Sequence, residues 1–141
     1  MGRILAIDYG RKRSGLAVSD NLKLIANGLC TVSTHQLLDY IINYISTENV
    51  DEIIIGKPKQ MNYEDSENFQ RIEIFVNTLK KRLTDIPVVY VDERFTSVLA
   101  HRAMIDAGLK KKTRRDKALV DKISAVIILQ TYLESNNINN L

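Results

Sequence analysis

The spacing of apolar residues changes along this chain from strand-like to helical and back, and this order limits the folds that it can adopt. Residues 3–8 and 14–19 are short apolar runs on either side of a basic turn, and 24–32 is a third run that contains Asn27-Gly28. The first two runs have the pattern of a β-hairpin, and Asn-Gly allows a bulge or an interruption in the third. Strands that follow one another so closely should pair antiparallel.

Helical and strand-like patterns alternate after the third run. Helical spacing predicts a helix over about 35–48 with Thr34 as N-cap, and 51–56 follows as a continuous apolar strand of the kind that is covered on both faces. The remaining predicted elements are a helix from Asp65 or Ser66, a strand over 88–91, a helix over 97–107 and a last helix capped by Asp116. Strands joined through helices pair in parallel, so we expect an α/β fold with a mixed five-stranded sheet, its three N-terminal strands antiparallel and the others parallel, flanked by helices.

Length and composition restrict the class of protein. A chain of 141 residues corresponds to one domain, over 1–135, and the Asn-rich end at 136–141 should be frayed. A content of 45% hydrophobic and 26% charged residues excludes a disordered or fibrous chain. Cys30 is the single cysteine, which excludes an internal disulfide and a metal site made of cysteines. The absence of a long apolar run and of a signal-peptide pattern predicts no membrane partner and a cytoplasmic location.

The net charge of +3 conceals two basic patches. Residues 11–13 are all basic, and 110–117 hold six bases and one acid, so the remainder of the chain is acidic. Because the local field attracts a polyanion, we expect nucleic acid as partner, bound through phosphates with little dependence on sequence. The candidate contact residues are Arg11, Lys12, Arg13, Arg94, Lys110, Lys111, Lys112, Arg114 and Arg115. A solvated loop is the alternative for 110–117, and Tyr9 or Phe95 could stack on an unpaired base.

Three acids occupy positions that packing does not require. Asp8 ends the first strand, Glu93 follows the last strand, and Asp121 lies early in the last helix. Functional groups gather where the strands of an α/β sheet end, and converging carboxylates repel unless cations lie between them. Mg²⁺ or Mn²⁺ would meet this need, and a pair of such ions can activate water for phosphodiester hydrolysis.

Each acid also has a simpler interpretation. Asp8 could mark the turn after the strand, and Asp121 could be a solvated acid favoured by the helix dipole. Asp121 does share a helix face with the small residues Ser124 and Ala125, which favours an orientation toward the sheet, although Val120, Ile123 and Ile127 form the predicted apolar face. Asp92 and Glu93 point to opposite sides of an extended chain, so only one of them can enter a common site.

Four segments together resemble the YqgF family. They are D-Y-G-R-K-R-S-G-L-A-V-S-D at 8–20, I-I-I-G-K-P at 53–58, V-D-E-R-F-T-S at 91–97 and V-D-K-I-S-A-V-I-I-L-Q-T-Y-L at 120–133. This bacterial group is related to RuvC-type Holliday junction resolvases and is described as pre-16S rRNA nucleases. The resemblance implies a ribonuclease-H-like fold, a metal-dependent nuclease site formed by Asp8, Glu93 and Asp121, and a cytoplasmic role in maturing the 5′ end of 16S rRNA during ribosome biogenesis. The chain departs from the family at one place, where Gly56-Lys57-Pro58 replaces the usual G-L-P and Lys59 adds a second lysine. These two lysines could contact a phosphate of the substrate or belong to a solvated loop.

Other functions stay open at this point. The family resemblance also fits a resolvase of Holliday junctions or other branched DNA, and basic patches without turnover would give an RNA-binding ribosome-assembly factor. Asp-x-Gly before a glycine-containing strand also resembles the phosphate hairpin of actin-like and sugar-kinase ATPases, but 141 residues leave no room for their second lobe. The oligomeric state, monomer or homodimer, is not indicated by any segment.

Overall fold

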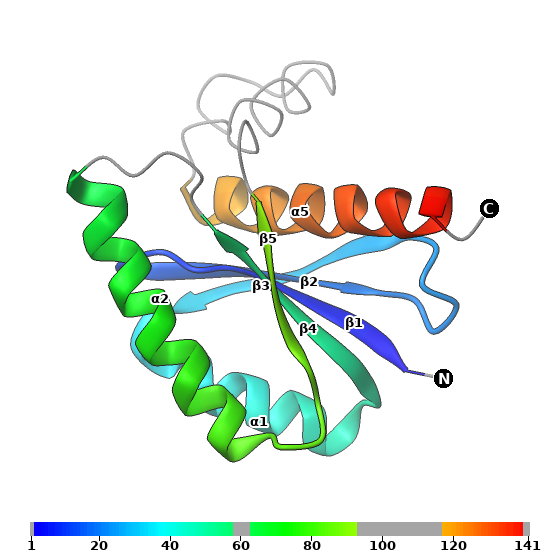
Figure 1. Cartoon of the computed structure of the whole chain (residues 1–141), viewed down its shortest axis with the longest axis horizontal. Coiled ribbons are helices and arrows are strands. Elements are labelled where there is room, and N and C mark those ends of the chain that lie inside the picture. Colours follow the sequence, from blue (N-terminus) through cyan, green and yellow to red (C-terminus); the bar gives the residue numbers. More distant parts are fainter. Residues whose placement is uncertain (1, 58–62, 93–116, 140–141) are drawn as a thin grey trace.

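A single mixed sheet forms the centre of the protein (Figure 1). The computed structural model describes residues 2–57, 63–92 and 117–139. The strands are β1 (Arg3–Asp8), β2 (Arg13–Ser19), β3 (Ala26–Ser33), β4 (Val50–Lys57) and β5 (Val88–Asp92), in the order β3-β2-β1-β4-β5. The pairs β1–β2 and β2–β3 are antiparallel, whereas β1–β4 and β4–β5 are parallel. The predicted mixed five-stranded sheet is thereby confirmed.

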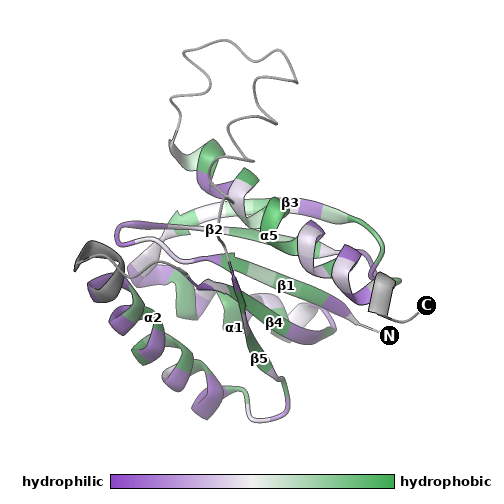
Figure 2. Cartoon of the chain, turned by 45° about the horizontal axis from the view of Figure 1, so that its top comes forward, coloured by the Kyte–Doolittle hydropathy of each residue, from purple (hydrophilic) through white to green (hydrophobic). Residues whose placement is uncertain are grey.

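Helices cover both faces of this sheet (Figure 1). A short 3-10 helix, η1 (Thr34–Gln36), leads into α1 (Leu37–Thr47), which lies with α2 (Tyr63–Arg82) on one face, and α5 (Lys117–Asn139) lies on the other. Alternate residues of β1 serve the two layers: Leu5 and Ile7 pack toward α1 and α2, and Ile4 and Ala6 pack toward α5. Figure 2 shows the same division, with apolar strands between helices whose outer faces are more polar. None of the described helices is long and apolar enough to cross a membrane.

The third strand differs from its predicted start and contains the predicted bulge. Leu24 and Ile25 lie in the turn before β3, because their backbone N–H groups donate to the carboxylate of Asp20. The pairing of β2 with β3 shifts by one residue, because Leu16 pairs with Cys30 and Ala17 pairs with Gly28. Leu29 is therefore the extra residue of a bulge that directly follows Asn27-Gly28.

The prediction for the start of the first helix was wrong. Thr34 does not cap α1, because its hydroxyl donates to the carbonyl of Gly10 and also bonds to Ser14. The last helix, α5, continues to Asn139, and the fraying expected from residue 136 stays a prediction. Leu133, one turn before residue 136, is buried, and Asn136 forms a hydrogen bond with Tyr132. Packing of this part of the helix therefore stabilises its last turn. The predicted helix over 97–107 lies outside the described residues.

Candidate active site

Asp8 lies at the carboxyl end of β1, on the side of the sheet that α5 covers. Side chains alternate along a strand, so Asp8 shares the face of Ile4 and Ala6, which pack against α5. Its cross-strand partner in β2 is Gly15. The end of the first strand therefore presents a half-buried carboxylate beside a residue that has no side chain.

Gly15 allows α5 to approach this point of the sheet closely. A Cβ atom at Gly15 would collide with the backbone carbonyl of Asp121. The opening turns of α5 are fixed from the other side too, since the hydroxyl of Thr31 donates to the carbonyl of Ala118 at 2.6 Å. Asp8 and Asp121 thus flank the same glycine, although they are 113 positions apart in the sequence (121 − 8 = 113).

The face of α5 that meets the sheet is the one that carries Asp121. Ser124, Ala125 and Ile128 on this face are buried, whereas Ile123 and Ile127 are only half-buried. The predicted apolar face was therefore wrong for Ile123 and Ile127, although Val126, a less regular member of it, packs against this core. The prediction that Asp121 turns toward the sheet is supported by this packing. Small residues are needed here because the helix rests on the backbone of β2.

Arg13 pairs with the carboxylate of Asp121. Its Nε donates to Oδ2 of Asp121 at 3.2 Å, and the two side chains are 40% and 25% exposed. Arg13 was expected to contact nucleic acid, but in this structure it holds a proposed metal ligand. The carboxylate of Asp121 already binds one cation, the guanidinium of Arg13, and a metal ion could take the place of that guanidinium.

The basic turn between β1 and β2 is built rigidly. Any side chain at Gly10 would collide with the carbonyl of Arg13. The backbone N–H of Thr34 donates to the carbonyl of Lys12 at 2.9 Å, and the Thr34 hydroxyl donates to the carbonyl of Gly10 at 2.7 Å. Arg11 and Lys12 are exposed at the tip of this turn, close to Asp8 in the chain. The turn therefore presents two solvated cations at the end of the sheet where the acids gather.

The alternation of side chains along β5 places Asp92 on one face of the sheet. Val88 and Tyr90 pack toward α1 and α2, and Val91 packs toward α5. Asp92 follows the alternation of Tyr90 and so belongs to the face away from α5. Glu93 lies outside the described residues, together with Arg94, Lys110, Lys111, Lys112, Arg114 and Arg115.

Lys57, one of the two lysines after β4, contacts an aromatic side chain. Its ammonium lies 5.3 Å from the centroid of the Phe69 ring, and Phe69 in turn packs on Tyr90 at 5.7 Å. The weak attraction between a cation and an aromatic ring favours one position of the Lys57 ammonium. Lys57 is still exposed, so it stays accessible to phosphate, and Lys59 lies outside the described residues.

The donor set fits a hard divalent cation as far as it is described. No group of three or more His, Cys, Asp and Glu side chains within 2–57, 63–92 and 117–139 is arranged to hold a metal. Asp8 and Asp121 nonetheless supply carboxylate oxygens, the ligands that Mg²⁺ and Mn²⁺ prefer. The ion pair with Arg13 shows that Asp121 faces a position that a cation can occupy.

Tyr9, next to Asp8, lies on the opposite face of the sheet end. Its ring packs on Phe75 of α2 with centroids 5.3 Å apart and planes inclined by 44°. Burial raises the pKa of the Tyr9 phenol, and the charge of Arg71 partly opposes this rise. Tyr9 is therefore a wall residue of the α1–α2 face, and Phe95, the other aromatic candidate, lies outside the described residues.

The sequence motifs do not indicate which residues contact the proposed metal ligands. Gly15 inside a strand was a usable signal, because such a glycine often marks a close backbone approach. The Arg13–Asp121 ion pair joins residues that are 108 positions apart, and no local sequence pattern predicts it. Thr34 and Arg71 carry no motif that separates them from ordinary surface residues.

Comparisons with known proteins place the chain in a family. The model of the RuvX family, described as Holliday junction resolvase, matches residues 2–135. A protein of Bacteroides thetaiotaomicron is 70% identical over 135 residues, covering 96% of this chain and 98% of the relative. A protein of Bacteroides fragilis is 68% identical over 138 residues, covering 98% of this chain and 100% of the relative. Both relatives bear the name "Putative pre-16S rRNA nuclease".

The fold has a counterpart among solved structures. Thermus thermophilus RuvC in complex with a Holliday junction substrate aligns with a TM-score of 0.58 over 97% of this chain and 96% of RuvC, at 14% identity. This likeness concerns the fold alone, and it confirms the expected ribonuclease-H-like architecture. With the family model matching residues 2–135 and relatives that are 68% to 70% identical over nearly their whole length, this chain belongs to the RuvX family, the YqgF group that its motifs resemble.

Proposed function

We propose that this chain is a divalent-metal-dependent nuclease that hydrolyses phosphodiester bonds at the 5′ end of pre-16S rRNA. The observation that carries the proposal is the meeting of Asp8 and Asp121 around Gly15, in a member of the RuvX family. Relatives with up to 70% identity bear the name of a pre-16S rRNA nuclease, which favours RNA as substrate. Cleavage of that precursor would place the protein in the cytoplasm, in contact with the precursor of the small ribosomal subunit.

Asp8, Asp121 and Glu93 would hold Mg²⁺ or Mn²⁺. When bound, such ions supply a nucleophilic water and stabilise the charge of the leaving oxygen. Glu93, not Asp92, is the third candidate, because Asp92 follows the face of Tyr90 and a strand alternates at each residue. The chain's own cations bind the substrate: Arg11 and Lys12 attract its phosphates beside the acids.

The test is cleavage of a 5′-extended 16S rRNA fragment at low salt with Mg²⁺ or Mn²⁺. Asp8→Asn and Asp121→Asn should each lower the rate by at least about 100-fold, because metal stabilisation of the transition state amounts to several kcal/mol. Chelation of the metal should abolish cleavage by the wild type. Asp85→Asn, an exposed carboxylate in the turn before β5, is the matched control and should keep full activity.

The other functions correspond to other outcomes of this experiment. The description of the family model favours a four-way DNA junction as second substrate, and preferential cleavage of that junction would make the protein a resolvase. If the wild type cuts neither substrate while Asp8→Asn and Asp121→Asn bind RNA as the wild type does, the protein is a non-catalytic RNA-binding factor. Release of phosphate from ATP would support the ATPase alternative.

A further inference from the structure

A second concave site lies one residue from Asp8, on the opposite face of the sheet. It is a pocket of about 330 Å³ between the end of β1, η1, the start of α1 and the middle of α2. All its lining residues belong to the described chain, and none of the proposed metal ligands is among them. The pocket is therefore a separate feature of the same end of the sheet.

The pocket has an apolar interior and a polar, cationic rim. Tyr9, Phe75 and Leu38 provide the interior, with the two rings packed on each other at 5.3 Å. Arg71, which is positively charged, and the imidazole of His35 are among the polar lining residues. An apolar cavity with a few converging polar groups is typical of a site for a small ligand or a ligand fragment.

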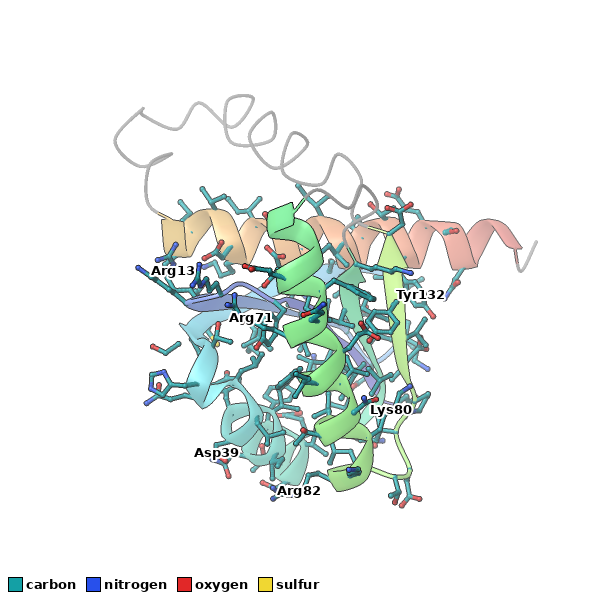
Figure 3. All side chains as sticks on the ribbon, turned by 60° about the vertical axis from the view of Figure 1, so that its left-hand side comes forward. Arg13, Asp39, Arg71, Lys80, Arg82 and Tyr132 are labelled. Atoms are coloured by element: carbon teal, nitrogen blue, oxygen red, sulfur yellow. The ribbon has the colours of Figure 1, made fainter. Side chains whose placement is uncertain are left out.

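Arg71 is available to such a ligand. It is half-buried on α2, and the charge that it contributes lowers the pKa of the Tyr9 phenol. The ion pairs among the described residues do not include Arg71. Figure 3 shows Arg71 on the side of the molecule that also carries Arg13, whereas Arg82 lies at the other end of α2. A cation that forms no ion pair with a carboxylate of the described residues, beside aromatic rings, suits a ligand that is both flat and anionic.

We propose that this pocket binds one unpaired nucleotide of the substrate strand, its base against Tyr9 and Phe75 and its phosphate at Arg71. This assignment rests on the proposed nuclease function and specifies which part of the substrate the enzyme selects. Aromatic side chains stack on unpaired bases of any sequence, and an arginine adds the contact to phosphate. The rim of the pocket also contains Thr34, which holds the turn with Arg11 and Lys12 in place.

The geometry allows one strand to reach both sites. Asp8 and Tyr9 are consecutive residues, so their Cα atoms are about 3.8 Å apart and their side chains leave the chain on opposite faces. Successive phosphates of one strand of a DNA duplex advance by roughly 3.4 Å along its axis, and an unpaired strand extends further per nucleotide. A strand that crosses the end of the sheet can therefore place a phosphate near Asp8 and a neighbouring nucleotide in the pocket. A paired base is not free to enter, so the pocket would select single-stranded or frayed ends without reading sequence.

Binding of a fluorescent single-stranded oligoribonucleotide, measured by anisotropy in the presence of EDTA, tests the pocket without cleavage. Ile74 lines the pocket mouth and is 68% exposed, so Ile74→Glu introduces a repulsive charge without disturbing the core. We expect Ile74→Glu to weaken binding by roughly 5- to 150-fold, the range that loss of one stacked base produces. Asn77→Glu adds the same charge one turn away, outside the pocket lining, and should bind as the wild type does.

A second pair of variants removes a positive charge. Arg71→Gln should weaken binding and remove one phosphate contact, which reduces the slope of log K against log salt by about 0.7 for a single strand. Arg82→Gln removes the same charge from the same face of α2, about 16 Å further along the helix axis, and should change neither quantity. Equal binding by Arg71→Gln and Arg82→Gln would overturn the phosphate assignment.

Photocrosslinking identifies the occupant. An oligoribonucleotide with one 4-thiouridine should crosslink to Tyr9 or Phe75, and Ile74→Glu should lose that crosslink. Crosslinks that map elsewhere, or a nucleoside monophosphate that binds as tightly as the oligonucleotide, would overturn the assignment to a substrate strand. If Asp8→Asn abolishes cleavage while Ile74→Glu binds normally, the pocket proposal fails and the nuclease stands. If nothing is cleaved while Ile74→Glu loses binding, the nuclease proposal fails and the pocket remains a site for single-stranded RNA.

Discussion

The substitution of Gly15 by alanine is the most direct test of how the packing of α5 on the sheet positions the proposed metal ligands. Gly15 pairs with Asp8 and lies under the carbonyl of Asp121, so one added methyl group acts on both acids without removing a functional group. A carbon and a carbonyl oxygen approach to about 3.3–3.6 Å at closest, and the added Cβ would be more than about 1 Å inside that limit. A backbone atom cannot rotate away, so the first turns of α5 must move outward.

The size of the effect follows from two opposing terms. Overpacking of this kind costs about 1–3 kcal/mol. Neither Gly15 nor Gly28 has a left-handed backbone, so alanine gains about 0.4–1 kcal/mol from the smaller entropy of the unfolded chain. The net loss for Gly15→Ala is between about 0 and 2.6 kcal/mol, which lowers Tm by up to roughly 8 °C for a chain of this length. A displacement of about 1 Å at Asp121 would also lower the cleavage rate by about 100-fold.

Gly28→Ala is the matched control under the same helix. A Cβ at Gly28 would meet Cδ and Cγ of Lys122 at 3.1 Å, and this flexible side chain can move by a few tenths of an ångström. Its free energy of unfolding should stay within about 0.5 kcal/mol of the wild type, and its activity should be unchanged. Thermal unfolding by circular dichroism and the rRNA cleavage assay measure both quantities. The reasoning is refuted if Gly15→Ala is as stable and as active as Gly28→Ala.

Three further predictions concern charge and pH. Arg13→Gln should change the free energy of unfolding by less than about 1 kcal/mol, because its pair with Asp121 is half-exposed, but should tighten Mn²⁺ binding in calorimetry by removing a competing cation; weaker binding would contradict this. Backbone N–H groups hold the pKa of Asp20 below 3.8, so Asp20→Ala should lower stability to urea at neutral pH, and the difference should shrink as pH falls below 3.8; a pH-independent difference would count against it. Burial raises the pKa of Tyr40 to about 12, so tyrosinate absorbance should show its ionisation well above 10.0, and the stability that this residue contributes should be lost as pH rises through that range. Tyr40→Phe should show less of this alkaline loss than the wild type.

The strands were predictable because their sequence patterns match their surroundings. Ile53, Ile54 and Ile55 form a continuous apolar run because β4 lies between two other strands and is covered by helices on both faces. Asn27-Gly28 allowed a bulge or an interruption in the third strand, and β3 forms the bulge at Leu29, directly after this pair. In both places the local pattern agrees with the fold.

The face of α5 was not predictable from periodicity. This helix carries apolar residues around most of its circumference, so no single stripe stands out. The contact with the sheet is decided instead by small side chains, Ser124 and Ala125, that let the helix rest on β2 at Gly15. A pattern search that weights hydrophobicity alone selects Ile123 and Ile127, which are only half-buried.

Charge counting along the sequence overestimates the attraction of the basic turn for nucleic acid. Three consecutive bases stand at 11–13, but the structure commits Arg13 to Asp121. Only Arg11 and Lys12 are exposed at the tip of the turn, which leaves about two phosphate contacts instead of three. The third cation becomes available only if another positive charge takes its place on Asp121. The charge of this surface is therefore a property of the folded arrangement, in which a partner 108 positions away decides what each base can bind.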